Sequence, residues 1–383
     1  MFIYQETATS NSALYTWWRT SLKALILAGG FGTRLRPLSC TRPKILFPII
    51  NKPLLQWIYE RLAQNNITEA ILAVNHQTAL HIKQQRVPKH GLTIKYSHDP
   101  PKTPLGTGGP IKKAEKLIGH TEPFLVINGD IFTNINYQKL LETHKKTNAT
   151  ATIALCKVED PSRYGVAQIA DDNRITRFIE KPPKNAAPTN LINAGVYALN
   201  PSIFKYIPEG RAVSMEREVF PQIVQEGALY GHIVKDRWID IGKPEEYLQT
   251  NKLLLNTVGN RQKHKSAGKF KFKHPVAIDK NVSIGEKSTI GPYAVLGKNV
   301  TVGKNVQINH SVIFLDTKIG DFSSITEAII GEGVIIGKNV KIRRGCIIAD
   351  QAKIKDNISL TDETAVCPGK EISENILKTK IIC

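Results

Sequence analysis

The sequence predicts an α/β domain with a doubly wound sheet, followed by a parallel β-helix of hexapeptide repeats. Three observations lead to this fold class. The chain has 383 residues, more than a single hydrophobic core usually serves. Strand-like and helix-like runs alternate in its first two thirds, and aliphatic residues recur every six positions in its last third. We therefore expect an N-terminal extension at 1–22, an α/β domain at 23–256, a basic linker at 257–273 and a repeat domain at 274–383.

Short β-rich runs and helical patterns alternate in the α/β domain. The segment 53–65 is typical of the helices, because proline stands in its first turn and its leucine and isoleucine side chains share one face. A doubly wound sheet binds ligands at the carboxyl ends of its strands, which is where the glycine-rich and acidic segments of this chain fall. The expected strands are 24–28, 70–74, 92–96 and 124–127, and the other expected helices are 77–85, 107–118 and 136–146.

A six-residue period dominates the repeat domain. Small or β-branched residues lie two positions before each aliphatic residue, and glycine often follows it. Such hexapeptides form a parallel β-helix, in which each coil buries its aliphatic side chains only by stacking on its neighbours. From Ile308 to Ile330 the gap is 22 residues, not a multiple of six, so we expect one loop or slip there. The aliphatic positions are Ile278, Ile284, Ile290, Leu296, Val302 and Ile308, then Ile330, Ile336, Ile342, Ile348, Ile354 and Leu360.

The composition is that of an ordinary globular protein. It is 41% apolar and 22% charged, and no apolar run approaches the ~20 residues that span a bilayer. Residues 1–22 lack the basic and apolar regions of a secretory signal, so we expect a cytoplasmic protein. The cysteines are scattered and lack the paired spacing of a zinc site. We expect all five to be reduced: Cys40, Cys156, Cys346, Cys367 and Cys383.

The net charge of +19 suits nucleic acid, an anionic membrane or phosphorylated substrates, and charge alone does not choose among them. The densest basic run, 261–273, has the composition of an exposed connector. No RNA-binding or helix-turn-helix signature accompanies it. We therefore expect neither nucleic acid nor a membrane as a partner, which leaves small phosphorylated substrates.

The segment 27–38, with the sequence LAGGFGTRLRPL, is the strongest candidate for a phosphate-binding loop. It follows a predicted strand directly, and Lys44 comes shortly after it. Glycine lets backbone N–H groups approach an anion closely, while Arg34 and Lys44 supply the fixed positive charge that a triphosphate requires. The segment fits neither the Walker A pattern nor the dinucleotide-binding fingerprint.

This loop resembles the opening signature of the sugar-1-phosphate nucleotidylyltransferases. Within that family the chain is most similar to the mannose-1-phosphate guanylyltransferases of eukaryotic catalytic-subunit type, through the segment 214–221, the hexapeptide domain and the tail 366–383. The resemblance implies a Rossmann-like nucleotidyltransferase domain with a mixed sheet, followed by a left-handed β-helix. The further segments that carry it are PLGTGG (104–109), NGD (128–130), YGV (164–166), FIEKP (178–182), INAG (192–195) and WIDIG (238–242).

The resemblance also implies roles for single residues. Asp130 and Asp240 would bind Mg²⁺, which prefers oxygen ligands and is often held by one or two carboxylates plus substrate phosphates. Arg34 and Lys44 would hold the phosphates of the nucleotide, and Gly106 would lie near its base. The remaining nucleotide contacts would be Leu27, Gly29, Gly30, Gly32 and Thr33, and the sugar phosphate would be bound by Gly165, Glu180, Lys181 and Asn193.

The implied reaction joins GTP and mannose 1-phosphate into GDP-mannose and pyrophosphate. A phosphate monoester is largely dianionic at neutral pH and is already a nucleophile, so the reaction needs no general base. Positioning and charge neutralisation supply the acceleration. The catalytic residues would be Arg34, Lys44, Asp130 and Lys181. We also expect a homo-oligomer, because hexapeptide helices commonly associate through their flat faces.

Two alternatives stay open at this stage. One is a thymidylyl- or uridylyltransferase for glucose 1-phosphate, which could be bifunctional if His310 in the repeat domain served an amino-sugar acetyltransferase. The other is a non-catalytic regulatory subunit of the same two-domain plan, against which the retained cations and both aspartates argue. Two residues depart from the family pattern, because Ile45 replaces a common proline and Gly108 a common alanine.

Overall fold

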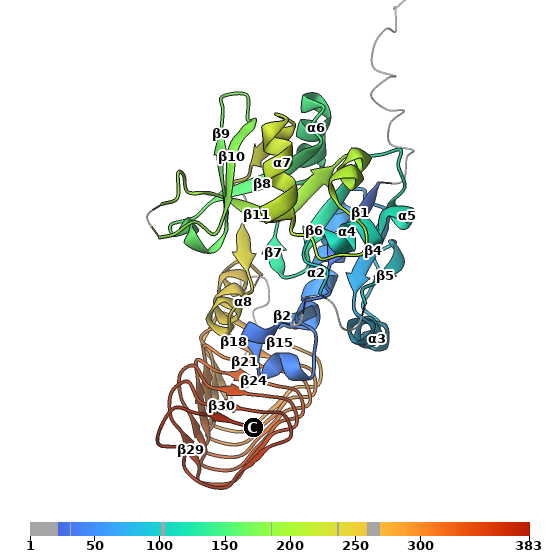
Figure 1. Ribbon diagram of the computed structural model, residues 1–383. Coiled ribbons are helices and arrows are strands. Elements are labelled where there is room, and N and C mark those ends of the chain that lie inside the picture. Colours follow the sequence, from blue (N-terminus) through green and yellow to red (C-terminus); the bar gives the residue numbers. More distant parts are fainter. Residues whose placement is uncertain (1–21, 31, 101–103, 185, 236, 259–268) are drawn as a thin grey trace, which may run out of the picture.

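The computed structural model describes residues 22–258, apart from 31, 101–103, 185 and 236, and residues 269–383. The α/β domain and the β-helix form two bodies, with helix α8 (Pro244–Val258) between them (Figure 1). Almost all of the N-terminal extension and most of the basic linker lie outside the described residues. The stretch between the two domains is shorter than the expected linker of 257–273. Helix α8 continues to Val258, and the first strand of the β-helix begins at Lys271.

A mixed nine-stranded sheet forms the centre of the α/β domain. Strand β1 (Lys23–Leu27) lies in its middle and pairs in parallel with β4 (Glu69–Val74) and β6 (Phe124–Asn128). The sheet order is β10-β9-β11-β6-β1-β4-β5, with β8 on β11 and β12 on β8. The four strands predicted from the sequence are therefore all present. The other strands are β5 (Thr93–His98), β8 (Ala151–Lys157), β9 (Gly165–Ile169), β10 (Ile175–Glu180), β11 (Leu191–Leu199) and β12 (Leu229–Ile233).

Helices cover both faces of this sheet. Successive residues of β1 point to opposite sides, so that Ala24 and Ile26 join one hydrophobic core and Leu25 joins the other. The helix expected at 107–118 is two short helices, because its chain bends at Ala114. The first face carries α2 (Leu54–Gln64), α3 (His76–Gln85) and α6 (Tyr137–Thr147), and the second carries α4 (Gly109–Lys113), α5 (Glu115–Ile118) and α7 (Phe220–Gln225).

Short elements shape the edge of the sheet where β1 and β6 end. They include two small antiparallel strand pairs, β2 with β3 and β7 with β13. The second pair aligns Asp240 with Ile131 and thereby brings Asp240 beside Asp130. These elements are β2 (Pro48–Ile49), β3 (Lys52–Pro53), β7 (Ile131–Thr133), β13 (Trp238–Asp240), the 3₁₀ turns η2 (Thr33–Leu35), η3 (Leu38–Cys40), η4 (Lys44–Leu46) and η5 (Pro161–Arg163), and the π-helical turn η7 (Met215–Val219). The 3₁₀ turn η6 (Pro201–Tyr206) lies at the opposite edge, because it follows the end of β11, which pairs with the start of β6.

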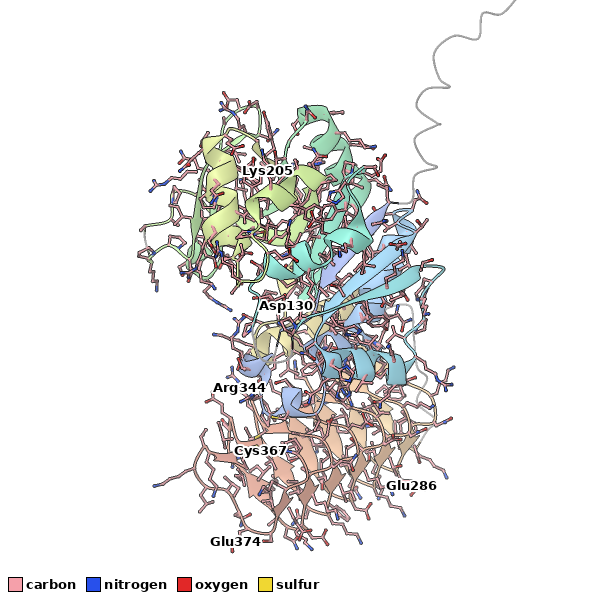
Figure 2. The ribbon with its side chains drawn as sticks, turned by 45° about the vertical axis from the view of Figure 1, so that its right-hand side comes forward. Asp130, Lys205, Glu286, Arg344, Cys367 and Glu374 are labelled. Atoms are coloured by element: carbon pink, nitrogen blue, oxygen red, sulfur yellow. A yellow bond between two sulfur atoms is a disulfide. The ribbon has the colours of Figure 1, made fainter. Side chains whose placement is uncertain are left out.

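The repeat domain is a parallel β-helix with three sheets, as predicted (Figure 2). Its strands are mostly two residues long, with one side chain outside and one inside, as in the exposed Lys341 and the buried Ile342. The first sheet is β14 (Lys271–Phe272), β17 (Thr289–Ile290), β20 (Gln307–Asn309), β23 (Ser324–Thr326), β26 (Lys341–Ile342) and β29 (Ser359–Leu360). The second is β15 (Val276–Ile278), β18 (Ala294–Leu296), β21 (Val312–Ile313), β24 (Ile329–Ile330), β27 (Ile347–Ile348), β30 (Ala365–Val366) and β32 (Ile381–Ile382). The third is β16 (Ser283–Ile284), β19 (Thr301–Val302), β22 (Lys318–Ile319), β25 (Ile335–Ile336), β28 (Lys353–Ile354) and β31 (Glu371–Ile372).

The irregular gap in the repeat is two short steps, where one loop or slip was expected. Ile313, Ile319 and Ile325 continue the buried row from Ile308 to Ile330, with five-residue steps at the two ends of the gap and six-residue steps between. Ile290 therefore pairs with Ile308, 18 residues later, but Ile308 pairs with Ile325 after 17. Each deletion falls in a turn, so the stacking of side chains inside the coil is preserved.

Most turns of the β-helix contain a residue with positive φ, often an asparagine such as Asn299 (φ 60) or Asn339 (φ 54), because asparagine tolerates the left-handed region. His310 occupies one of these positions (φ 49). Its backbone N–H donates to the Pro292 carbonyl over 2.8 Å, and its ring packs on Tyr293 with the centroids 5.2 Å apart. These contacts give His310 a structural place in the turn.

The outer face of the second β-helix sheet packs against the α/β domain. Phe314 is 2% exposed and makes edge-to-face contacts with Phe47 and Tyr247, each with ring centroids 6.3 Å apart. The Asn51 amide donates to the Leu296 carbonyl over 2.9 Å. The two domains therefore share a continuous hydrophobic core in addition to their separate ones.

The cysteine prediction is wrong for one pair. Cys367 and Cys383 form a disulfide, with their Cα atoms 4.8 Å apart, because β32 folds back beside β30 and brings the last residue next to Cys367. The remaining three cysteines are free. Among the described residues, no helix combines the length and the apolarity that crossing a membrane requires.

Candidate active site

Three parallel strands end at the same edge of the sheet and bring together the residues that follow them. Gly29 follows β1, Asp130 follows β6 and Asp99 follows β5. The ends of β1 and β6 touch, because the N–H of Gly129 donates to the Leu27 carbonyl over 2.8 Å, and a Cβ at Gly129 would lie 2.7 Å from that oxygen. This edge is the ligand-binding position of a doubly wound sheet.

A cavity of about 410 Å³ opens at this edge. Gly32 gives the loop its turn with a φ of 57°, and the Ser39 hydroxyl donates to its carbonyl over 2.8 Å. All the residues predicted to bind the nucleotide line this cavity, and Asp130 lines it as well. The nucleotide residues are Leu27, Gly29, Gly30, Gly32, Thr33, Arg34, Lys44 and Gly106. The structure thus gathers in one place residues that the sequence spreads over a hundred positions.

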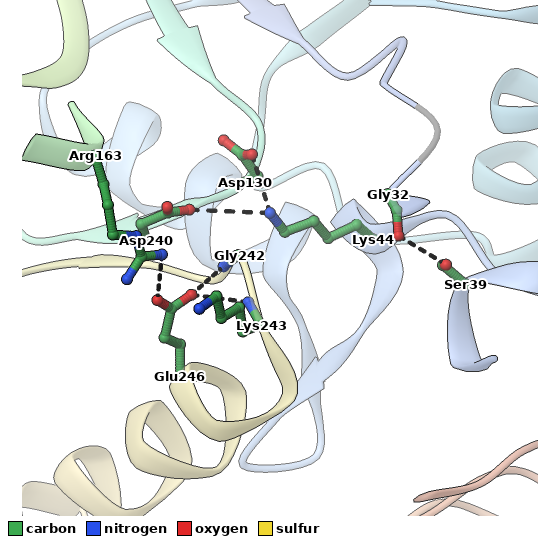
Figure 3. A network of polar contacts seen from close by, with 9 residues as sticks. All are labelled: Gly32, Ser39, Lys44, Asp130, Arg163, Asp240, Gly242, Lys243 and Glu246. Carbon is green, nitrogen blue, oxygen red and sulfur yellow. Dashed lines mark hydrogen bonds and ion pairs between the residues drawn. The ribbon is translucent and has the colours of Figure 1, made fainter. Parts of the chain in front are cut away.

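The side chain of Lys44 and the carboxylates of two aspartates form a charged cluster at this edge of the sheet. The Lys44 ammonium lies 3.0 Å from Oδ2 of Asp130 and 4.0 Å from Oδ1 of Asp240 (Figure 3). Burial, followed by the charge of Asp130, raises the pKa of Asp240, while Lys44 lowers it less strongly. Two carboxylates that already share one cation fit a divalent metal held by few protein ligands. Within the described part of the chain, no group of three or more His, Cys, Asp or Glu offers a complete metal cage.

A second cavity of about 680 Å³ adjoins the first. Arg34, Gly106 and Asp130 line both cavities, so the two cavities meet beside a positively charged side chain and one of the predicted metal ligands. The second cavity contains every residue predicted to bind the sugar phosphate, and Asp240 as well: Gly165, Glu180, Lys181, Asn193 and Asp240.

Polar side chains in the second cavity are held in place by one another. The Lys181 ammonium lies 3.3 Å from Oε1 of Glu180, and Lys181 itself has a φ of 51°, which turns the chain at the end of β10. Burial, then the charge of Glu216, raises the pKa of Glu180. The Asn193 amide donates to the Tyr197 hydroxyl over 2.9 Å. Carboxylate and amide oxygens so arranged can accept hydrogen bonds from several sugar hydroxyls.

Sequence reasoning missed Asp99, which lines the nucleotide cavity. Its Oδ1 atom is buried and has no hydrogen-bond partner among the described residues, and burial raises the pKa of its carboxyl group. Its Oδ2 atom lies so close to Gly29 that a Cβ there would be 2.4 Å away. A buried polar atom without a partner usually marks the place of a ligand or water. The available signal was an acidic residue shortly after a predicted strand. Asp130 occupies a similar position, but its role was predicted from the family resemblance.

A second missed group closes the side of the sugar cavity. Arg163 pairs with Oε1 of Glu246 over 2.7 Å, and Oε2 of Glu246 accepts from the backbone N–H groups of Gly242 and Lys243 over 2.9 and 2.8 Å. Figure 3 shows this group beside Asp240. It ties the start of α8 to the loop before β9. No local sequence signal predicts the pairing of Arg163 with Glu246, because these two residues lie 83 positions apart.

Comparison with known proteins matches this arrangement to two family models. The model for nucleotidyl transferase matches residues 23–257, and the model for the GMPPB C-terminal domain matches residues 272–382. The chain belongs to the nucleotidyl transferase family. It is 36% identical over 361 residues to a mannose-1-phosphate guanyltransferase of Aspergillus fumigatus, covering 93% of this chain and 98% of that protein. It is 35% identical over 364 residues to mannose-1-phosphate guanylyltransferase 1 of Arabidopsis thaliana, covering 94% of this chain and all of that protein.

The family extends to solved structures. The α/β domain resembles HddC from Yersinia pseudotuberculosis, with a TM-score of 0.53 and 30% identity, covering 61% of this chain and 99% of that one. A further structure of HddC, complexed with GMP-PN, gives a TM-score of 0.52. The resemblance predicted from the sequence, the fold class and the assignment as an enzyme of this kind are therefore confirmed. The roles of single site residues stay predictions.

Proposed function

We propose that this enzyme forms GDP-mannose and pyrophosphate from GTP and mannose 1-phosphate. The observation that carries the proposal is the pair of adjoining cavities, which meet at Arg34 and Asp130. One cavity has the glycine loop suited to a triphosphate, and the other has the acids and amides suited to a sugar. The similarity to mannose-1-phosphate guanylyltransferases supports mannose 1-phosphate and GTP as the specific pair.

Asp99 supports guanine as the base. Guanine presents two neighbouring donors, N1–H and the 2-amino group, and a carboxylate presents two acceptors at matching spacing. Adenine offers a donor beside an acceptor, and uracil and thymine offer one donor between two acceptors, so each would bring an acceptor against Asp99. Oδ1 of Asp99, which is buried without a partner among the described residues, would thus gain a hydrogen bond only from the right base.

The reaction is a direct displacement at the α-phosphorus of GTP. An oxygen of the mannose 1-phosphate dianion forms the new P–O bond, and the bond between the α-phosphorus and the bridging oxygen of pyrophosphate breaks. Arg34 and Lys44 would hold the triphosphate, and Lys181 would hold the sugar phosphate in line with it. These cations would also neutralise the charge that shifts onto pyrophosphate.

We assign Mg²⁺ to Asp130 and Asp240, as the donor set of two carboxylates allows. A bound Mg²⁺ supplies electrostatic stabilisation of the phosphate oxygens. Lys44 forms ion pairs with both aspartates (Figure 3). The cytoplasmic location and the homo-oligomeric state expected from the sequence belong to the same proposal.

Pyrophosphate release by the purified protein with Mg²⁺ tests this function. GTP, ATP, UTP and dTTP would each be combined with mannose 1-phosphate and with glucose 1-phosphate. We expect the highest kcat/KM for GTP with mannose 1-phosphate and no release without a sugar phosphate. A different best pair would overturn the specificity, and inactivity with every pair would favour the regulatory-subunit alternative.

A further inference from the structure

The chain between the phosphate loop and Lys44 lies directly on the β-helix. Arg42 is only 7% exposed and forms ion pairs with Glu332 and with Oδ2 of Asp350, the latter over 3.7 Å. The Thr41 hydroxyl donates to the same Asp350 oxygen over 2.7 Å. In Figure 1 this part of the chain, before β2, lies against the strands β15, β18 and β21.

One of the two carboxylates that receive Arg42, that of Asp350, is itself fixed by the β-helix. Glu332 and Asp350 lie on stacked coils, 18 residues apart. Oδ1 of Asp350 accepts a hydrogen bond from the Glu332 backbone N–H over 2.7 Å. The Arg42 guanidinium also lies over the Phe314 ring, 5.2 Å from its centroid. An ion pair shielded in this way is costly to break on one side, because it leaves a buried charge without its partner.

Short turns connect this contact rigidly to the reacting groups. Only Pro43 separates Arg42 from Lys44, and proline restricts the backbone on both of its sides. The Phe47 N–H donates to the Lys44 carbonyl over 3.0 Å, and the Lys44 ammonium ends 3.0 Å from Asp130. A displacement of Arg42 would therefore move the base of the Lys44 side chain.

We propose that Arg42 is a positioning residue for catalysis, through which Glu332 and Asp350 of the β-helix hold Lys44 against the reacting phosphates. The identity of the reaction rests on the function proposed above. The contact between Arg42 and the β-helix does not depend on that function. It gives the β-helix a part in catalysis beyond that of a scaffold. It also assigns a role to Arg42, whose partners lie about 300 residues away along the chain.

The test compares Arg42→Met with Asn51→Gly. Methionine keeps an unbranched apolar stem and removes the charge. Asn51→Gly removes another hydrogen bond between the domains at a residue with φ of 62°, which glycine adopts readily, and it leaves the 32–44 segment untouched. We expect Arg42→Met to lower kcat by about 10- to 100-fold with KM values within about threefold of wild type, as for a misplaced catalytic group. Arg42→Lys should recover part of this loss, and Asn51→Gly should keep the wild-type kcat.

Amide hydrogen exchange of segment 37–47 provides a readout that does not depend on activity. Exchange there should quicken in Arg42→Met and stay at the wild-type rate in Asn51→Gly. If Arg42→Met lowers the melting temperature but leaves kcat and this exchange unchanged, Arg42 is only an interface residue and the proposal is wrong. If the wild type is inactive with every substrate pair, the proposed function fails, while the exchange comparison still decides whether the β-helix holds this segment.

Discussion

Asp99→Asn is the substitution that most sharply probes how the base is read. Asparagine has the same shape but replaces one carboxylate oxygen with an amide NH₂ group, so at least one of the two hydrogen bonds from guanine is lost. A hydrogen bond to a charged group contributes about 1.5–3 kcal/mol. The loss of one, with a donor now facing a donor, should cost about 2–3 kcal/mol, or roughly 30- to 160-fold in kcat/KM for GTP.

The assay compares GTP with ITP, whose base lacks the 2-amino group. The wild type should prefer GTP by about 10- to 100-fold, and the preference should shrink to within about threefold in Asp99→Asn. Because burial raises the pKa of Asp99, its ionised form destabilises the folded protein above the unfolded pKa, so the variant should not melt earlier at neutral pH. Asp172→Asn, at an exposed turn, is the matched control. An unchanged ratio of GTP to ITP turnover in Asp99→Asn would refute base reading by this carboxyl.

Three further predictions concern the base turn, the sugar cavity and the domain interface. Gly106→Ala should weaken GTP binding by more than about tenfold in calorimetry, because Gly106 has φ of 70° and a Cβ would lie 2.3 Å from the Val213 carbonyl oxygen; unchanged affinity would contradict the placement of this turn. Burial and Glu216 raise the pKa of Glu180, so Glu180 gains a proton earlier than an ordinary glutamate as pH falls, and KM for mannose 1-phosphate should rise in that range. Glu180→Gln should have a raised KM without this pH dependence, and a wild-type pH profile in the variant would count against the assignment. Phe314→Ala should reduce the free energy of unfolding by about 3–5 kcal/mol in urea denaturation, whereas a loss below about 1 kcal/mol would mean that the interface contributes little.

The sequence predicted the architecture well because both domains have strong local patterns. Burial on both faces makes β1 and β6 continuous apolar runs, and the six-residue period holds through most of the β-helix. The two five-residue steps were missed because Ile313, Ile319 and Ile325 fit the six-residue period only once the positions of both shorter steps are known. A gap of 22 residues can be divided into five- and six-residue steps in several ways. The pairing of Cys367 with Cys383 was missed because it follows from the return of β32, a long-range contact.

The site residues that belong to short sequence motifs were predicted. Those whose importance depends on contacts between distant parts of the chain were missed. Arg34 and Lys44 belong to one recognisable segment, and the glycine loop needs only local backbone geometry. Asp99 lies between less distinctive residues, and its importance becomes visible only when its Oδ1 atom is seen to be buried without a partner. Arg42 is an ordinary basic residue in the sequence, and only the β-helix that packs on it supplies its carboxylates.

The central claim is that mannose 1-phosphate attacks the α-phosphorus of GTP directly, held between two adjoining cavities. The most direct test uses one diastereomer of GTP with sulfur on its α-phosphorus, together with mannose 1-phosphate and Mg²⁺, and determines the configuration of the product by phosphorus NMR. A single in-line displacement predicts pyrophosphate and a thio-substituted GDP-mannose with inverted configuration. Retained configuration would show two successive displacements through an enzyme-bound nucleotide, and would contradict the mechanism.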